Sequence, residues 1–237
     1  MAVFRTPRPS NLPGRSCFGI SLGQVRYDDG VDNASIFVLA GGRSSRMGSD
    51  KALLSLGGIN LLQRALGAAK EASPSTQIVG NPKHYAQYGD VIDDVIPGCG
   101  PLGGIHAALG ATHAGLNLIL SVDMPLMTPD FLRWLLQIAA SCDELAIVPK
   151  AQGRTQPLCS VFRRPALTEV ERALRAGQYK VDRLFSVLPT RFIAESEWRA
   201  AGFSPDIFRN VNTPEEYAAV AEMLEENRTV SVRGTTP

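Results

Sequence analysis

The part of this sequence with the clearest potential for chemistry is residues 39 to 51, where glycines, hydroxyls and basic side chains occur together. The residues are Leu39-Ala40-Gly41-Gly42-Arg43-Ser44-Ser45-Arg46-Met47-Gly48-Ser49-Asp50-Lys51. Glycine lets backbone N–H groups approach phosphate oxygens, and Arg46 and Lys51 would neutralise a triphosphate and the charge that develops during transfer. We therefore predict a phosphate-binding loop. The competing interpretation is a solvated basic loop, because a glycine pattern alone is weak evidence.

A second chemical feature is an acidic residue directly after an apolar segment. Asp123 follows Leu116-Asn117-Leu118-Ile119-Leu120-Ser121-Val122. A carboxylate at such a position can hold Mg²⁺, which binds oxygen ligands and bridges phosphates in transfer sites. We predict a metal site at Asp123. The structural alternative is an Asp that caps the turn before Met124-Pro125.

Two further polar residues follow predicted strands. Asp94 precedes Pro97-Gly98-Cys99-Gly100-Pro101, which is too rich in turn formers to be helix or strand, so its carboxylate would be presented from a loop. An Asx-turn is the alternative there, and Asp93 could exchange roles with Asp94. Asn81 follows the strand that ends near Val79, and an Asn-Pro turn would explain it equally well.

The second half of the chain holds two candidates for binding a phosphorylated acceptor. Arg154, in Gly153-Arg154-Thr155-Gln156-Pro157, is suited to bidentate phosphate contact, although a hairpin-like turn with an exposed charge is as good an interpretation. Asn212 could contact the metal or the acceptor. Thr213 could instead cap a final helix with Pro214 at its first position, which would make the motif structural.

The histidines and cysteines give no comparable signal. His84, His106 and His113 have no partner spacing, and no Ser-His-Asp or Cys-His arrangement can be recovered from the sequence. The four cysteines are scattered, which predicts neither a disulfide framework nor a structural zinc site and favours a reducing, cytoplasmic setting.

Composition limits the class of protein. The chain has 237 residues, with 24 basic and 23 acidic side chains, so it has no global field to attract nucleic acid or a membrane surface. It lacks an apolar run of the roughly 18 to 20 residues that a membrane helix needs, and we expect no secretory signal. Residues 1 to 33 are predicted to be a poorly ordered extension, 34 to 226 one folded domain, and 227 to 237 a flexible tail.

The elements that must position these residues alternate between strand and helix. Strands are predicted at Ile36 to Ala40, Gln77 to Val79, before Asp93, at Leu116 to Val122, Ala146 to Val148 and Leu158 to Phe162. Helices are predicted from Leu61 to Ser73, Gly104 to His113, after Thr128-Pro129, from Pro165 to Ala176 and from Pro214. This alternation predicts a three-layer α/β fold with a mainly parallel sheet, whose ligands lie beyond the carboxyl ends of the strands.

Four motifs in a fixed order resemble the molybdenum cofactor guanylyltransferases, a family of nucleotidyltransferases with a Rossmann-like fold. The loop at 39 to 51 is neither a standard P-loop nor a dinucleotide fingerprint, but it contains this family's Leu-Ala-Gly-Gly, Arg-Met-Gly and Asp-Lys. The other motifs are Asp94 followed by Gly100-Pro101-Leu102-Gly103-Gly104, then Asp123-Met124-Pro125, then Asn210-Val211-Asn212-Thr213-Pro214-Glu215-Glu216. The likeness runs from Val38 to about Ala219. Ser49 stands alone where some members have two residues, which affects only the expected conformation of the loop.

The resemblance implies a Rossmann-like α/β/α fold similar to the nucleotide-diphospho-sugar transferases. It also implies transfer of GMP from GTP to the molybdenum-molybdopterin cofactor, giving molybdopterin guanine dinucleotide and pyrophosphate, with Mg²⁺ as the cofactor. The catalytic residues would be Lys51, Arg46 and Asp123, with Asp123 also binding the metal. The nucleotide contacts would be Leu39, Ala40, Gly41, Gly42, Lys51, Asn81, Asp94 and Asp123, and the candidate acceptor contacts are Arg154 and Asn212. Expected partners are the two substrates and, transiently, proteins of cofactor biosynthesis or molybdoenzyme maturation, with no nucleic acid and no membrane.

Four alternative functions stay open. Enzymes that use CTP on the same acceptor have nearly the same loop, and donor choice depends on base contacts that the sequence does not place. Sugar-phosphate or isoprenoid-precursor nucleotidyltransferases are disfavoured by Asp50, since they usually have Pro before this Lys. A nucleotide-binding module without turnover is disfavoured by the presence of both Lys51 and Asp123. A purely structural partner protein would show no thermal stabilisation by nucleotide.

Overall fold

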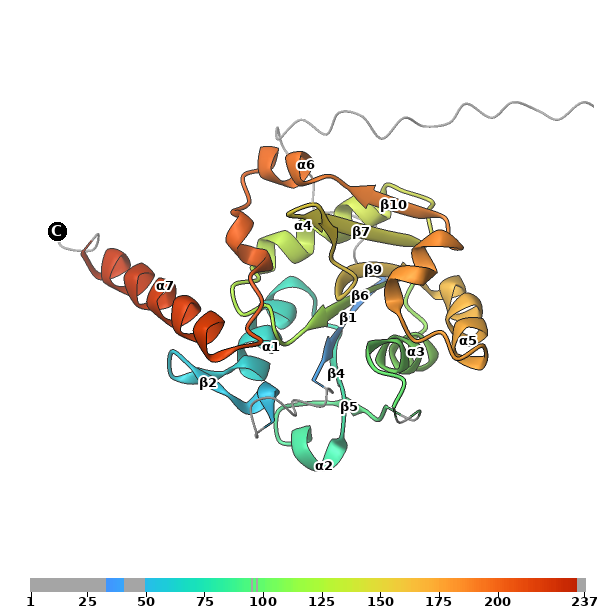
Figure 1. Ribbon diagram of the computed structural model, residues 1–237, viewed down its shortest axis with the longest axis horizontal. Helices are drawn as coiled ribbons and strands as arrows, with labels where there is room; N and C mark the ends of the chain where they lie inside the picture. Colours follow the sequence, from blue (N-terminus) through green and yellow to red (C-terminus); the bar gives the residue numbers. More distant parts are fainter. Residues whose placement is uncertain (1–32, 41–49, 95, 97, 234–237) are drawn as a thin grey trace, which may run out of the picture.

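The centre of the fold is an eight-stranded sheet (Figure 1). The computed structural model describes residues 33 to 40, 50 to 94, 96 and 98 to 233, and it describes side chains only up to residue 226. The strand order is β10-β7-β9-β6-β1-β4-β5, and β8 pairs with β7 outside this path. The strands are β1 (Ala34–Leu39), β4 (Thr76–Val79), β5 (Val91–Ile92), β6 (Leu116–Ser121), β7 (Ala146–Ala151), β8 (Arg154–Thr155), β9 (Cys159–Arg163) and β10 (Thr190–Ile193).

Most neighbouring strands of this sheet are parallel. β1 pairs in parallel with β4 and β6, β4 with β5, and β10 with β7, while β9 lies antiparallel between β6 and β7. Because two antiparallel steps restore the direction, β7 points the same way as β6. The carboxyl ends of β1, β4, β6 and β7 therefore meet at one edge of the sheet, as the predicted mainly parallel α/β fold requires.

Helices cover both faces of the sheet and form the outer layers (Figure 1). One face carries α1 (Leu61–Ala72), α4 (Pro129–Ala140) and α6 (Glu195–Ala200), and the other carries α3 (Pro101–Ala111), α5 (Leu167–Arg175) and the 3-10 turn η3 (Val181–Ser186). The remaining elements are the hairpin of β2 (Ser55–Leu56) and β3 (Ile59–Asn60), α2 (Pro82–Tyr85), α7 (Pro214–Arg233) and the 3-10 turns η1 (Lys51–Leu53), η2 (Arg164–Ala166) and η4 (Pro205–Phe208). The predicted three-layer arrangement is confirmed.

The burial of β1 explains its position in the middle of the sheet. Ile36 and Val38 belong to the core cluster under α1 and α4, whereas Phe37 and Leu39 belong to the cluster under α3 and α5. Successive side chains of a strand point to opposite faces, so a continuous apolar run is suited to a strand with a helical layer on each side.

Local sequence signals account for several helix ends. The Thr128 hydroxyl accepts a hydrogen bond from the Phe131 N–H at 3.3 Å, and Pro129 occupies the first helical position of α4. The predicted start of α3 at Gly104 is too late by three residues, because Pro101 again takes the first helical position. The residue before it, Gly100, has a φ of 60°, which favours glycine.

Other boundaries differ from the sequence-based expectations. The predicted tail boundary at Glu226 falls inside α7, which continues to Arg233. Residues 1 to 32 of the predicted extension lie outside the described residues. The β2–β3 hairpin, α2, β8, β10 and α6 were not predicted, because they are short and their apolar periodicity is too brief to detect. Among the described residues, no helix has both the length and the apolar character needed to cross a membrane.

Candidate active site

The best-defined candidate site lies at the carboxyl edge of the sheet and centres on the Lys51 ammonium group. Lys51 Nζ donates to Asn212 Oδ1 at 2.7 Å and lies 3.4 Å from Asp123 Oδ2. Residues that are 72 and 161 positions from Lys51 in sequence thus contact the same nitrogen. We call Lys51, Asp123 and Asn212 the Lys51 cluster.

Lys51 is presented by a short 3-10 turn that begins directly after Asp50. One carboxylate oxygen of Asp50, Oδ1, accepts a hydrogen bond from the Ala52 N–H at 3.1 Å and caps this turn. The other oxygen, Oδ2, lies 2.7 Å from the hydroxyl of Tyr85. Both carboxylate oxygens of Asp50, the residue before Lys51, are therefore hydrogen-bonded within the protein.

Asp123 combines a paired oxygen with an unpaired one. It follows β6, and its carbonyl oxygen accepts a hydrogen bond from the Val211 N–H at 2.9 Å, which holds the 210 to 212 segment against it. Its side chain is 20% exposed; Oδ2 faces Lys51, whereas Oδ1 is buried and has no hydrogen-bond partner among the described residues. A buried carboxylate oxygen without a donor is costly, so it is available to a cation or another ligand.

Asn212 lies just before α7, where its backbone takes part in the helix cap and its side chain contacts Lys51. The Thr213 hydroxyl accepts from the Glu216 N–H, and Glu216 Oε2 accepts from the N–H groups of Asn212 and Thr213. This reciprocal cap confirms the predicted helix start at Pro214. The cap leaves the Asn212 side chain directed to Lys51. Two residues earlier, Asn210 has a buried amide oxygen for which the described residues provide no hydrogen-bond partner, and the sequence analysis gave it no separate role.

Asp94 is the second acid with a buried, unpaired oxygen at this edge. Within the described part of the chain its Oδ1 has no hydrogen-bond partner, and a Cβ placed on Gly103 of α3 would lie 2.9 Å from that atom. Burial raises the pKa of the Asp94 carboxyl, with a smaller upward contribution from Asp93, while a backbone hydrogen bond from Ile96 and the nearby His106 oppose the rise. Glycine at position 103 thus leaves room for the Asp94 carboxyl, of which Oδ1 has no described hydrogen-bond donor.

The remaining predicted nucleotide contacts differ in how much of each residue is accessible. Leu39 and Ala40 are each 5% exposed, so only their backbone can meet a ligand. The amide oxygen of Asn81 accepts from the Lys83 N–H at 3.0 Å and caps α2, which accounts for the predicted Asn-Pro turn. Gly41, Gly42 and Arg46 lie outside the described residues.

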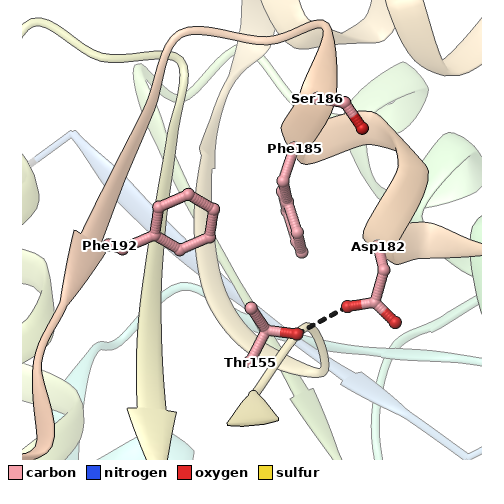
Figure 2. Close-up of a pocket in the computed structure, with 5 residues that line it drawn as sticks. All are labelled: Thr155, Asp182, Phe185, Ser186 and Phe192. Carbon is pink, nitrogen blue, oxygen red and sulfur yellow. Dashed lines mark hydrogen bonds between the residues drawn. The ribbon is translucent and has the colours of Figure 1, made fainter. Parts of the chain in front are cut away.

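Arg154 is not part of the Lys51 cluster. It is exposed on β8, next to Thr155, whose hydroxyl donates to Asp182 Oδ1 at 2.6 Å. Thr155 and Asp182 border a hollow of about 410 Å³ across which Phe185 and Phe192 face each other, as Figure 2 shows. We call this the β8 hollow; its lining is Thr155, Asp182, Phe185, Ser186 and Phe192.

The donor set at the sheet edge fits a divalent cation that is shared with a substrate. Within the described part of the chain, no group of three or more His, Cys, Asp or Glu side chains could hold a metal ion alone. One carboxylate with a free oxygen remains at Asp123. Mg²⁺ commonly takes one or two carboxylates and completes its shell with substrate phosphates and water, which suits such a site.

A family comparison agrees with this geometry. Residues 36–191 match the model of the MobA-like NTP transferase domain. This range begins inside β1, includes Lys51, Asp94, Asp123 and Arg154, and ends before Asn212.

Individual relatives extend the likeness to about four fifths of the chain. A probable molybdenum cofactor guanylyltransferase of Pelotomaculum thermopropionicum is 34% identical over 194 residues, covering 81% of this chain and 94% of the relative. The molybdenum cofactor guanylyltransferase of Vibrio cholerae is 31% identical, covering 78% and 90%. The crystal structure of molybdopterin-guanine dinucleotide biosynthesis protein A from Archaeoglobus fulgidus has a TM-score of 0.73 and 27% identity, covering 81% and 99%.

Proposed function

The chain belongs to the MobA-like NTP transferase domain family, and we propose that it transfers GMP from GTP to the molybdenum-molybdopterin cofactor. The products are molybdopterin guanine dinucleotide and pyrophosphate. The terminal phosphate of the acceptor attacks the α-phosphorus of GTP, so a bond forms between them as the bond to the pyrophosphate oxygen breaks. Within this family, the observation that carries the proposal is the Lys51 cluster, in which a lysine meets an acid with an unpaired oxygen.

Lys51 has the role of neutralising phosphate charge. Its ammonium group is held by Asn212 at 2.7 Å and by the more distant Asp123 carboxylate at 3.4 Å. Phosphate oxygens are strong acceptors for an ammonium group, and a lysine at a defined position stabilises charge that grows in the transition state. Arg46 has the same role in this proposal, although it lies outside the described residues.

Asp123 is the residue that would hold the divalent cation, which we propose to be Mg²⁺. The unpaired Oδ1 supplies a hard anionic ligand, and the Lys51 ammonium beside Oδ2 limits the negative charge left at the site. A cation held by Asp123 would supply positive charge that stabilises the phosphate oxygens of the substrate. Asn212 positions Lys51 and, in our proposal, also reaches the acceptor.

The site needs no strong general base. A phosphate nucleophile is ionised at neutral pH, so alignment and charge neutralisation suffice. Consistent with that, the described contacts of the Lys51 cluster involve an ammonium, a carboxylate and an amide, without a histidine.

The nucleoside end of GTP is assigned to the neighbouring strand ends. We propose that the backbone of Leu39 to Gly42 approaches the phosphates and that Asp94 and Asn81 contact the nucleoside. Asp94 is the strongest of these assignments because the residues that the structure describes offer its buried Oδ1 no hydrogen-bond partner. Arg154, exposed on β8, is proposed for the acceptor, and cofactor-biosynthesis or molybdoenzyme-maturation proteins are proposed as transient partners.

The test is pyrophosphate release with molybdopterin acceptor, Mg²⁺ and each of GTP, CTP, ATP and UTP. We expect GTP to give the highest kcat/KM and Asp123→Ala to lower it by about a thousandfold. Asp182→Asn is the matched control, because it alters an acid whose carboxylate is already bonded to Thr155. Preference for CTP would change the proposal to a cytidylyltransferase, release with none of the four would favour a binding module, and an active Asp123→Ala enzyme would remove Asp123 from the site.

A further inference from the structure

We propose that Tyr85 is a positioning residue for Lys51, acting through the carboxylate of Asp50. The inference rests on the role of Lys51 in the proposed transfer. Tyr85 ends the short helix α2 and is 4% exposed, so it is not itself a surface for substrate. Its importance lies in the two oxygen atoms that its hydroxyl contacts.

The Tyr85 hydroxyl joins two parts of the chain that are far apart in sequence. It lies 2.9 Å from the carbonyl oxygen of Ala40 and 2.7 Å from Asp50 Oδ2. Ala40 follows β1 and is anchored to β4 by a hydrogen bond from its N–H to the Val79 carbonyl at 3.0 Å. Ala40 and Asp50 are the described residues on either side of residues 41 to 49. The Tyr85 oxygen therefore lies between the turn that carries Lys51 and the end of the central strand, within hydrogen-bond distance of both.

Asp50 transmits this contact to Lys51. Oδ2 is held by Tyr85 while Oδ1 accepts from the Ala52 N–H, and the Asp50 carbonyl accepts from the Leu53 N–H at 3.0 Å. A carboxylate bonded at both oxygens has little freedom to rotate. The turn that begins at Lys51 is consequently fixed in position and direction, and the ammonium group reaches Asn212 and Asp123 from there.

The ring of Tyr85 is itself locked against the sheet. A Cβ added at Gly80, which follows β4, would lie 2.8 Å and 2.9 Å from two ring carbons of Tyr85, closer than such atoms can approach. Only glycine at position 80 allows the ring to lie there. Sequence reasoning gave Gly80 no role, because the need for glycine arises from a ring that is near only in the fold.

The hydroxyl remains a donor at physiological pH. Burial, followed by the Asp50 carboxylate, raises the pKa of Tyr85 well above its ordinary value. The phenol has one proton and two acceptors within reach, and a carboxylate is a stronger acceptor than a carbonyl. The bond to Asp50 is also the shorter, so that bond is the one that directs the Lys51 turn. His84 also faces Asp50 Oδ2, with its Nδ1 3.9 Å away, but its side chain is largely exposed.

The direct test is Tyr85→Phe, with Tyr88→Phe as the matched control. Both substitutions remove one phenol oxygen from the same segment, but Tyr88 accepts from the Asn60 side chain and has no bond to Asp50. We expect Tyr85→Phe to lower kcat about tenfold with little change in KM for GTP, because a misplaced ammonium loses contact with charge that grows in the transition state. Tyr88→Phe should keep kcat within about twofold. Equal kcat in the two variants, measured well below both Tm values, would overturn the proposal.

A second variant tests the route through Asp50 and does not depend on the folding of Tyr85→Phe. Asp50→Ala should lower kcat at least as much, and in that background Tyr85→Phe should add less than about a twofold further loss, since the two residues act as one unit. Wild-type kcat in Asp50→Ala contradicts the proposal, as do losses that simply multiply in the double variant.

A substrate-free measurement separates this proposal from the proposed function. Hydrogen exchange of the amides of residues 52 to 54 should be about tenfold faster in Tyr85→Phe than in wild type and unchanged in Tyr88→Phe. If wild type released no pyrophosphate with any triphosphate, the proposed function would fail, while this exchange pattern would still support Tyr85 as the anchor of the Lys51 turn. Unchanged exchange in Tyr85→Phe would refute the anchor even in an active enzyme.

Discussion

Two regions of this protein place acids near the same sheet, and they differ in whether those acids are satisfied. Among the described residues, Asp123 in the Lys51 cluster and Asp94 at the same edge of the sheet each keep a buried oxygen without a hydrogen-bond partner. In the β8 hollow, the Asp182 carboxylate accepts from Thr155 at 2.6 Å, and the Ser186 hydroxyl donates to the Arg183 carbonyl at 3.1 Å (Figure 2).

The difference indicates which region is arranged for a ligand. Buried polar groups in native proteins are nearly always paired. An unpaired carboxylate oxygen on Asp123, whose other oxygen faces a lysine, therefore marks a place where the missing partner comes from outside. The β8 hollow has a volume of about 410 Å³, yet its polar side chains are paired with one another or with the backbone, and the rest of its lining is aromatic. The candidate site is therefore identified by a buried oxygen without a described hydrogen-bond partner, and not by the volume of a cavity.

The largest expected effect is the loss of the Lys51 ammonium. Lys51→Met keeps most of the side-chain length but removes the charge, and we expect pyrophosphate release to fall by a few hundredfold in kcat/KM. Lys150→Met is the control, since Lys150 lies 4.5 Å from the Phe192 ring centre on the β8 side. If steady-state kinetics gave similar losses for both lysines, the proposed difference between the two regions would be wrong.

Replacing Asp94 should have opposite effects on nucleotide binding and on stability. Asp94→Asn should weaken GTP binding about tenfold by calorimetry, because the nucleoside loses a charged acceptor. Without ligand, the variant should be more stable at neutral pH, since it removes a buried charge without a partner at Oδ1. Stronger GTP binding in the variant would contradict our assignment of Asp94.

The gain in stability expected for Asp94→Asn should increase as the pH rises. Burial raises the pKa of Asp94 above its ordinary value of 3.8, so the stability contributed by the protonated group is present in acid and lost as the pH rises through the folded-state pKa. The excess stability of Asp94→Asn should therefore grow from about pH 4 toward neutral pH in thermal unfolding. An excess that shrank over this range would show that burial does not dominate.

A smaller effect is expected at Asn212. Asn212→Ala removes the 2.7 Å acceptor of Lys51 but leaves the Asn212 N–H, which Glu216 binds, in place. We expect a several-fold loss of kcat/KM without a change in the melting of α7. Circular dichroism distinguishes this outcome from loss of the helix cap, which Thr213→Ala would cause.

The smallest effect should come from the β8 hollow. Thr155→Val removes the hydroxyl that pairs with Asp182, which should destabilise the fold by less than about 1 kcal/mol because both side chains are near solvent. GTP-induced stabilisation in thermal unfolding should be unchanged. A clear loss of that stabilisation would place part of the nucleotide site at the hollow and would erase the difference between the regions.

The main elements of the fold could be predicted because their signals are local. A run that is apolar at successive positions marks β1 as buried on both faces, and Thr128-Pro129 marks the start of α4. The same locality explains the errors. The predicted start of α3 was too late because Pro101 was assigned to the preceding turn, and the predicted end of the fold fell inside α7.

The candidate site was only partly predictable. Lys51, Asp94, Asp123 and Asn212 could be named from motifs in the sequence, but their spacing along the chain does not say which of them meet. The direct bond between Lys51 and Asn212, over 161 positions, depends on the cap of α7 and on the hydrogen bond from Val211 to Asp123. Tyr85 gave no sequence signal at all, because a single tyrosine near a turn has no pattern.

By itself, the sequence determined the order of the longer strands and helices, the family, and the kinds of side chain available for phosphate and metal. These follow from periodicity and from short motifs, whose physics involves residues a few positions apart. Only the tertiary structure decided that Lys51 is held between Asn212 and Asp123, that Asp123 and Asp94 keep unpaired oxygens, and that Tyr85 anchors Asp50. Hydrogen bonds and desolvation act over a few ångströms of space, and that proximity arises only when the sheet brings distant strand ends to one edge.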